Sequence, residues 1–103
     1  GHERDAWKVK LEIFYTRHYR TASAAIYDFI EKNVGKKDAD KFLIRIEKVL
    51  NLIATNPYMF KSSNFDKSVR VGLINKRHSF LYKVSENNIY ILFIWDNKQE
   101  PLF

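Results

Sequence analysis

The chain has 103 residues, of which 46% are hydrophobic and 16% aromatic, so it holds enough apolar material for the core of one domain and is not a disordered chain. It has no cysteine, which excludes disulfide bonds, thiol catalysis and cysteine-bound metal clusters. Its 18 Lys and Arg against 12 Asp and Glu give a formal net charge of +6, which fits a polyanionic partner such as nucleic acid, the ribosome, an anionic membrane or an acidic protein, and fits equally a charge carried for solubility alone. We treat residues 1–103 as a single domain and set Gly1-His2 aside as a remnant of cloning.

The sequence carries no sign of a membrane segment, a metal site or a cofactor site. Its longest apolar run, residues 89–95, is far shorter than the roughly 20 residues of a transmembrane helix. No signal-peptide pattern opens the chain, so we expect a cytoplasmic protein. No two histidines or carboxylates have the spacing of metal ligands, and three glycines cannot build a phosphate-binding loop. We therefore expect no metal ion and no cofactor.

A strand and a helix are the first elements that the pattern predicts. Apolar residues at every second position, Val9, Leu11, Ile13 and Tyr15, indicate a strand with one buried face. Thr16 is a suitable N-cap for a helix whose apolar residues recur at helical spacing as far as Gly35. Glycine tolerates the left-handed backbone conformation that often follows a helix.

A second helix is predicted after a short break. Asp38 is its candidate N-cap, and Asn56-Pro57 ends it because the residue before a proline resists helical geometry. Its apolar stripe consists of Phe42, Ile46, Val49, Leu50 and Ile53. Two helices joined so closely should pack antiparallel.

Three strands complete the predicted domain. Apolar residues alternate over 69–73 and 80–84, and Asn87-Asn88 marks a turn. Residues 89–95 are apolar on both faces, which is typical of a central strand. The order β-α-α-β-β-β predicts an α+β fold in which a helical hairpin packs on one face of a mainly antiparallel four-stranded sheet.

Residues 67–85 carry five cations and no acidic residue, namely Lys67, Arg70, Lys76, Arg77 and Lys83. Alternation puts Arg70 on the polar side of its strand, and residues 75–78 fall where a hairpin should turn, which places cations on an exposed rim able to bind phosphate or carboxylate groups. The alternative is a charged edge hairpin that resists aggregation. His78, in the same turn, is a candidate general acid or base; the alternative is an ordinary surface histidine.

The segments 68–84 and 88–101 resemble the RelE/ParE toxin superfamily in the order and spacing of their motifs. These motifs are an Arg on the strand after the helix pair, Tyr82-Lys83-Val84 closing the next strand, an Ile-x-Ile-Leu strand and a polar tail ending in Pro101, with Asn56-Pro57 upstream at the end of the second helix. The resemblance covers residues 8–101. It implies the RelE/ParE-like fold and the toxin half of a bacterial type II toxin–antitoxin pair, which a cognate antitoxin neutralises by wrapping it.

The RelE-like branch of this superfamily cuts mRNA on the ribosome with several basic residues and a late tyrosine or histidine. Of these positions only Arg70 matches, because Gly72, Ser79 and Gln99 stand where basic residues are expected and the chain stops at Phe103, before the tyrosine. If the chain is a nuclease, its candidate catalytic residues are Arg70, Arg77 and His78.

The ParE-like branch inhibits DNA gyrase and lacks that nuclease set, so these losses favour a ParE-like toxin without intrinsic catalysis. Two alternatives stay open: a ribosome-dependent mRNA endoribonuclease with an atypical site, and a non-toxic antitoxin partner or co-repressor. A homodimer through the helical hairpin is a further interpretation left open.

Two candidate surfaces follow. The candidate target-binding residues are Arg70, Lys76, Arg77, His78, Lys83 and Lys98. Strand alternation predicts that Phe14, Ile74 and Leu81 lie on the sheet face away from the helices, where an antitoxin would cover them.

Overall fold

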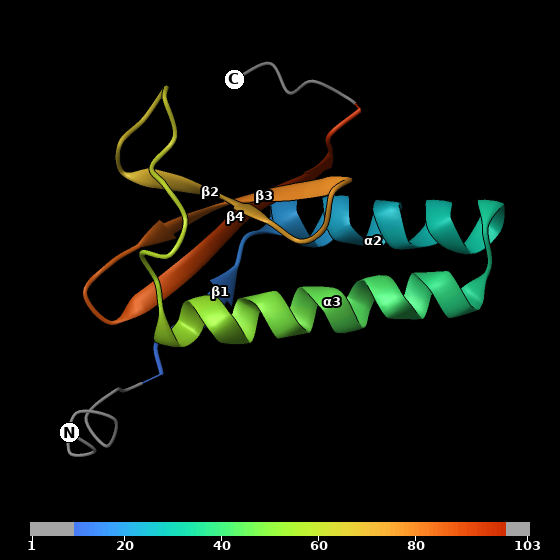
Figure 1. Ribbon diagram of the computed structural model, residues 1–103, viewed down its shortest axis with the longest axis horizontal. Coiled ribbons are helices and arrows are strands. Elements are labelled where there is room, and N and C mark those ends of the chain that lie inside the picture. The colour runs from blue at the N-terminus through green and yellow to red at the C-terminus, as the bar shows by residue number, and fades with distance from the viewer. Residues whose placement is uncertain (1–9, 99–103) are drawn as a thin grey trace.

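Two helices pack on one face of a four-stranded sheet in the computed structural model, which describes residues 10–98 (Figure 1). In chain order the elements are β1 (Glu12–Tyr15), α2 (Arg17–Asn33), α3 (Lys36–Thr55), β2 (Val69–Leu73), β3 (His78–Val84) and β4 (Asn88–Asp96). The predicted element order and the α+β class are confirmed. Val9 of the predicted first strand, Gln99 and Pro101 lie outside the described residues.

The sheet has the strand order β1-β4-β3-β2, so the doubly apolar strand β4 is central, as predicted. β3 pairs antiparallel with β2 and with β4, while β1 runs parallel to β4 with Ile13 opposite Ile89. The register of β3 against β4 shifts between Leu81 and Tyr82. This irregularity makes Leu92 an extra residue in β4, so that Ile89, Ile91 and Ile94 all lie buried.

The helix ends follow the local sequence with one correction. Thr16 caps α2 by accepting a hydrogen bond from the N–H of Tyr19, and Asn56 ends α3. Gly35 lies between the helices with a φ of 143°, a conformation that L side chains rarely adopt. The prediction that Asp38 caps α3 is wrong, because the helix already begins after Gly35; Asp38 lies in its first turn, where a carboxylate still interacts favourably with the helix dipole.

The core lies between α3 and the helix side of the sheet. Its buried residues are Tyr19, Phe42, Ile46, Val49, Leu50, Ile53, Ile74, Phe80, Tyr82, Ile89, Ile91 and Ile94. All five apolar residues of the predicted α3 stripe belong to this set. Each large apolar side chain buried in this way stabilises the fold by about 1.5–3 kcal/mol.

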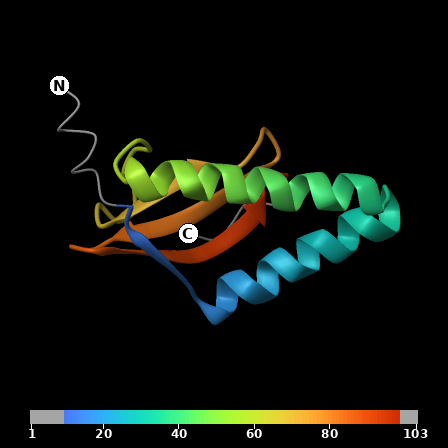
Figure 2. The ribbon, with the colours of Figure 1, turned by 90° about the horizontal axis from the view of Figure 1, so that it is seen from below.

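Cross-strand pairing decides which residues face the helices. Arg70 lies opposite Tyr82 and Val71 opposite Leu81, and direct partners in a sheet share a face. Arg70 therefore lies on the helix side of the sheet, whereas Val71 and Leu81 lie on the helix-free face. The end of the helical hairpin at which α2 and α3 join projects beyond the sheet, as both views show (Figure 1 and Figure 2).

Neither helix combines the length and apolar character needed to cross a bilayer.

Candidate functional site

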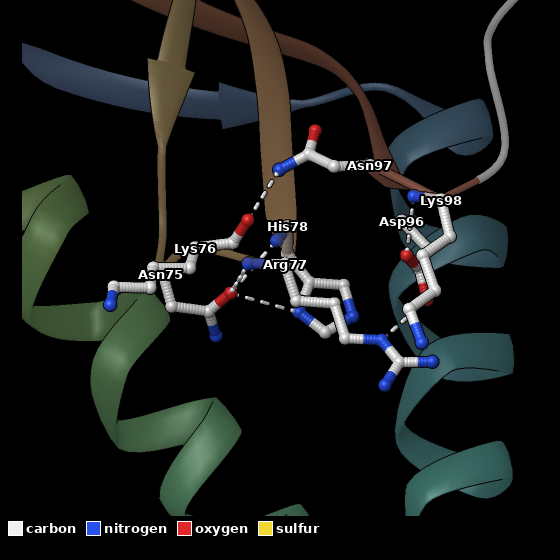
Figure 3. Close-up of polar contacts among 7 residues, drawn as sticks. All are labelled: Asn75, Lys76, Arg77, His78, Asp96, Asn97 and Lys98. Atoms are coloured by element: carbon white, nitrogen blue, oxygen red, sulfur yellow. Dashed lines mark hydrogen bonds and ion pairs between the residues drawn. The ribbon is translucent and has the colours of Figure 1, made fainter.

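A polar network joins the turn between β2 and β3 to the end of β4 (Figure 3). The Oδ1 atom of Asn75 accepts hydrogen bonds from the backbone N–H groups of Arg77 and His78, both at 2.8 Å. The Asn97 side chain donates to the carbonyl oxygen of Lys76 at 3.0 Å, and its backbone N–H donates to the carbonyl oxygen of Arg77. Two asparagines therefore fix the backbone from which Lys76 and Arg77 project. We define the turn-end cluster as Asn75, Lys76, Arg77, His78, Asp96, Asn97 and Lys98.

His78 is the first residue of β3 and is only 5% exposed, so it is not the rim residue that the hairpin pattern predicts. Its ring packs on Phe42 of α3, with ring centroids 4.9 Å apart, and its Nδ1 lies 3.2 Å from Asn75 Oδ1. Because that oxygen can only accept, Nδ1 carries the hydrogen and Nε2 of the neutral ring carries the lone pair. Burial lowers the pKa of His78, opposed by the Asp96 carboxylate and reinforced by Arg77.

Arg77 and Asp96 form the ion pair of this cluster. Arg77 Nε donates to Asp96 Oδ2 at 2.8 Å, and the side chains are 49% and 19% exposed, respectively. The backbone N–H of Lys98 donates to the other carboxylate oxygen at 2.8 Å. Burial favours a higher pKa for Asp96, but the Lys98 N–H and the Arg77 guanidinium outweigh it and lower the pKa. Asp96 therefore stays ionised and orients Arg77.

An apolar groove of about 590 Å³ runs beside the cluster, between α2 and the end of β4. Its walls are Ala22, Ala25, Ile26, Phe29, Ile30 and Val34 of α2 and Phe93, Ile94 and Trp95 of β4, and Arg77, His78, Asp96 and Lys98 form its polar end. Phe29 and Val34 are 57% and 65% exposed, near the end of α2 that projects beyond the sheet. The apolar walls of this groove fit the apolar face of an amphipathic protein segment.

Arg70 lies toward the other end of the hairpin, and contacts within the chain engage it. Its Nη1 donates to the carbonyl oxygen of Phe60 at 2.6 Å, and its guanidinium lies 4.8 Å from the ring centre of Tyr58. Tyr82, opposite Arg70, donates its hydroxyl to the carbonyl oxygen of Pro57 at 2.7 Å. Together these contacts fix the loop that precedes β2.

The structure does not bring all six candidate target-binding residues together. Lys83 is five residues from His78 along β3, about 17 Å at the rise of a strand, and shares the helix-free face with its partner Tyr90. Arg70 pairs with Tyr82, which lies four residues from His78 along β3, a distance of roughly 13 Å. Only Lys76, Arg77, His78 and Lys98 are neighbours. The three candidate nuclease residues therefore do not form one constellation.

Packing explains two of the departures from the nuclease pattern. A Cβ added at Gly72 would lie 2.4 Å from the ring tip of Phe80 and 3.1 Å from the ring of Phe60, so this position has no room for a side chain. Ser79 is 3% exposed and donates its hydroxyl to Asn97 Oδ1 at 2.7 Å. A basic residue at Gly72 would collide with the core, and one at Ser79 would break the turn-end cluster.

The helix-free face holds two of the three predicted antitoxin contacts. Phe14 is 41% exposed and stacks on Tyr90, with ring centroids 5.6 Å apart. Leu81 lies on the same face but is only 7% exposed. The predicted position of Ile74 is wrong. The chain turns inward after β2, so Ile74 is 1% exposed in the core, and Arg45 of α3 donates to its carbonyl oxygen at 2.7 Å.

The sequence-based prediction missed the residues that organise the cluster, namely Asn75, Asp96 and Asn97. The available signal was the Asp96-Asn97 pair directly after the apolar run of β4, where this central strand ends. Within residues 10–98 no three His, Asp or Glu side chains gather as metal ligands would.

A helical hairpin on one face of a β1-β4-β3-β2 sheet is a fold that this chain shares with solved structures of other proteins. Residues 13–101 match the family described as the ParE toxin of the type II toxin–antitoxin system parDE. Because the match spans most of the sequence, the chain belongs to this family. No curated protein sequence matches the chain closely enough to count as a relative.

Solved structures share the fold at low sequence identity. A structure described as the chromosomal ParDE toxin–antitoxin system of P. aeruginosa is 24% identical, covers 84% of this chain and 96% of that chain, and has a TM-score of 0.70. The YoeB dimer of Staphylococcus aureus is 21% identical over 82% of this chain and 94% of its own, with a TM-score of 0.57. A YoeB/ParE toxin of Agrobacterium tumefaciens is 12% identical over 84% and 98%, with a TM-score of 0.59.

Proposed function

We propose that the protein is a ParE-like toxin that acts in the bacterial cytoplasm, inhibits DNA gyrase without catalysing a reaction, and is neutralised by a cognate antitoxin. The family match supports the toxin class. The observation that carries the choice of gyrase over mRNA is the dispersal of the candidate nuclease residues: Arg70 contacts Phe60 and Tyr58, roughly 13 Å along the sheet from His78.

Dispersal argues against a nuclease on physical grounds. Phosphodiester cleavage needs a proton-transfer group and charge stabilisation within hydrogen-bond reach of the same phosphate. The Nη1 of Arg70 already donates to a backbone carbonyl oxygen. The second basic position of the RelE-like nuclease pattern is Gly72 here, which has no room for a side chain. A protein that binds its target without cleaving it needs no such constellation.

The test has an in-vitro and a cellular arm. Purified full chain should inhibit supercoiling by DNA gyrase, and Lys67→Ala, a charge change in the loop before β2, should leave that inhibition intact. In bacteria, induction should reduce thymidine incorporation before amino-acid incorporation. Undiminished supercoiling at excess protein, or an early collapse of protein synthesis, contradicts the proposal.

The groove beside α2 is the surface that we assign to the antitoxin, together with Phe14 on the helix-free face, where Leu81 lies too deeply buried to add a contact of its own. Phe29 and Val34 leave an apolar surface open near the end of α2, and such a surface is typical of a partner-binding site. Phe29→Glu should weaken antitoxin binding at least tenfold while the chain stays folded. Glu31→Gln, on the exposed side of the same helix, is the matched control.

A ribosome-dependent nuclease is the second candidate, because one observation favours it. Burial lowers the pKa of His78, which favours the neutral ring, and His78 lies beside Arg77 at the polar end of a groove. If His78 moves a proton, His78→Gln should reduce mRNA cleavage on the ribosome by about a hundredfold or more. Unimpaired growth under strong expression of folded protein would instead indicate a non-toxic co-repressor.

A further inference from the structure

We infer that four cations at the turn end of the sheet bind the phosphate backbone of duplex DNA, so that the toxin contacts DNA directly as well as its protein target. The four are Arg45, Lys76, Arg77 and Lys98, which we call the cationic rim. The inference rests on the proposed function, because gyrase acts on DNA, and it specifies the partner that the turn-end cluster meets.

The rim is assembled from three separate parts of the chain. Arg45 reaches from α3 to the β2–β3 turn, where its Nε donates to the carbonyl oxygen of Ile74 at 2.7 Å. Lys76 extends from the turn toward α3, whereas Arg77 and Lys98 lie together on the α2 side (Figure 3). The rim therefore crosses the end of the sheet from one helix to the other.

Both arginines of the rim are oriented before any ligand binds. Each uses its Nε in a hydrogen bond within the chain, Arg45 to the Ile74 carbonyl oxygen and Arg77 to Asp96 Oδ2, so the terminal nitrogens keep donors for an external oxygen. Asn97 holds the backbone at Lys76 and Arg77. Planar, pre-oriented guanidinium groups suit phosphate oxygens, which accept charge-assisted hydrogen bonds.

The charge and chemistry of the rim favour nucleic acid over an acidic protein. The turn-end cluster holds three cations, Lys76, Arg77 and Lys98, and one carboxylate, Asp96, and Arg45 adds a fourth cation beside it. Protein interfaces are depleted in lysine and centre on an apolar core, whereas phosphate contacts need cations alone.

Duplex DNA fits the rim better than a single strand does. Single-strand sites stack bases on open aromatic faces, and the rim itself contains no aromatic residue. Two rings of the adjoining groove, Phe93 and Trp95, are half-buried and stack on each other with centroids 6.4 Å apart. Neutralised phosphates make binding strongly dependent on salt, with a slope of log K against log salt of about −0.9 for each phosphate. Three to four contacts should therefore give a slope of about −3.

The experiment measures binding of the full chain to a 20-base-pair duplex of arbitrary sequence by fluorescence anisotropy between about 50 and 200 mM salt. The double variant Lys76→Ala/Lys98→Ala should make binding less dependent on salt, with the slope changing from about −3 to about −1. It should also weaken binding about tenfold for each ammonium removed. The control Lys61→Ala/Lys67→Ala removes the same charge from the loop before β2, and should leave the slope near −3. All four side chains belong to exposed residues, so both variants should fold, which circular dichroism checks.

Three results overturn the inference: no duplex binding at the lowest salt, equal slopes in the two double variants, which means that only diffuse charge acts, or tighter binding of a single-stranded RNA of the same length. Gyrase inhibition is measured independently of duplex binding, so that the two proposals can fail separately. Duplex binding without gyrase inhibition contradicts the proposed function alone, and gyrase inhibition without duplex binding contradicts this inference alone.

Discussion

The two arginines of the β2–β3 hairpin lie near opposite ends of the sheet, and their surroundings differ in kind. Arg70 donates to the Phe60 carbonyl oxygen and lies against the Tyr58 ring, so it stabilises the loop before β2. Arg77 contacts the Asp96 side chain at a half-exposed position. A hydrogen bond from a charged group that fixes a backbone loop contributes more to stability than a surface ion pair does. The first arginine therefore belongs to the fold, and the second is available for a partner.

Gly72→Lys should have the largest effect on stability, and it tests whether the Arg70 end can be turned into a nuclease site. The new Cβ would overlap the Phe80 ring, so we expect destabilisation of about 3 kcal/mol, measured by urea unfolding. No mRNA cleavage should appear. A stable variant that cleaves mRNA would show that only one missing cation separates this chain from a nuclease.

Arg70→Ala should destabilise the protein by about 2 kcal/mol, because the Phe60 carbonyl loses a charged donor and the Tyr58 ring loses its cation. Toxicity measured per folded molecule should not change. Arg70→Lys is the informative companion, since it keeps the charge but not the geometry of the guanidinium. A folded Arg70→Ala variant without toxicity would move Arg70 into the functional surface.

His78 should make stability depend on pH at the turn end. Burial lowers its folded pKa below the ordinary value of 6.5, so as pH falls the unfolded chain takes up the proton first. This contribution to stability is fully present above pH 6.5 and is lost as pH falls below it. His78→Gln should flatten the dependence between about pH 7.5 and pH 5.5, while Asn51→Gln, which replaces one exposed group without charge by another, should leave it unchanged. The same slope in both variants contradicts this assignment.

Arg77→Ala should have the smallest effect on stability, within about 1 kcal/mol, because exposed ion pairs contribute little. Its effect on growth inhibition should be large. The order of the two arginines would then reverse between the two measurements: Arg70 matters more for thermal unfolding, and Arg77 matters more for toxicity. Equal effects of both arginines in both measurements would remove the distinction between the two ends.

The sequence could predict the elements of this fold because their signals are local. The helical spacing of Phe42, Ile46 and Val49, the cap at Thr16 and the stop at Asn56 each depend on residues a few positions apart, and all agree with the structure. The central position of β4 followed from its two apolar faces in the same way.

The site was predictable only in part, because alternation within a strand gives two rows and does not say which row faces the helices. Pairing with Tyr82 placed Arg70 on the helix side, and a tight turn carried Ile74 into the core. The burial of His78 depends on Phe42, which lies 36 positions earlier in the chain. Contacts of this kind leave no periodic trace in the sequence.

The parallel pairing of β1 with β4 has a consequence for the synthesis of the toxin. Glu12 lies opposite Asn88, so 76 residues separate the two partners in the chain. At about 5–20 residues per second, a ribosome needs roughly 4–15 seconds to add them. During that interval the two helices exist without the sheet that covers their apolar stripe. Asp96, Asn97 and Lys98 of the turn-end cluster are added only after Asn88, so this cluster cannot form until the last strand of the sheet has been made.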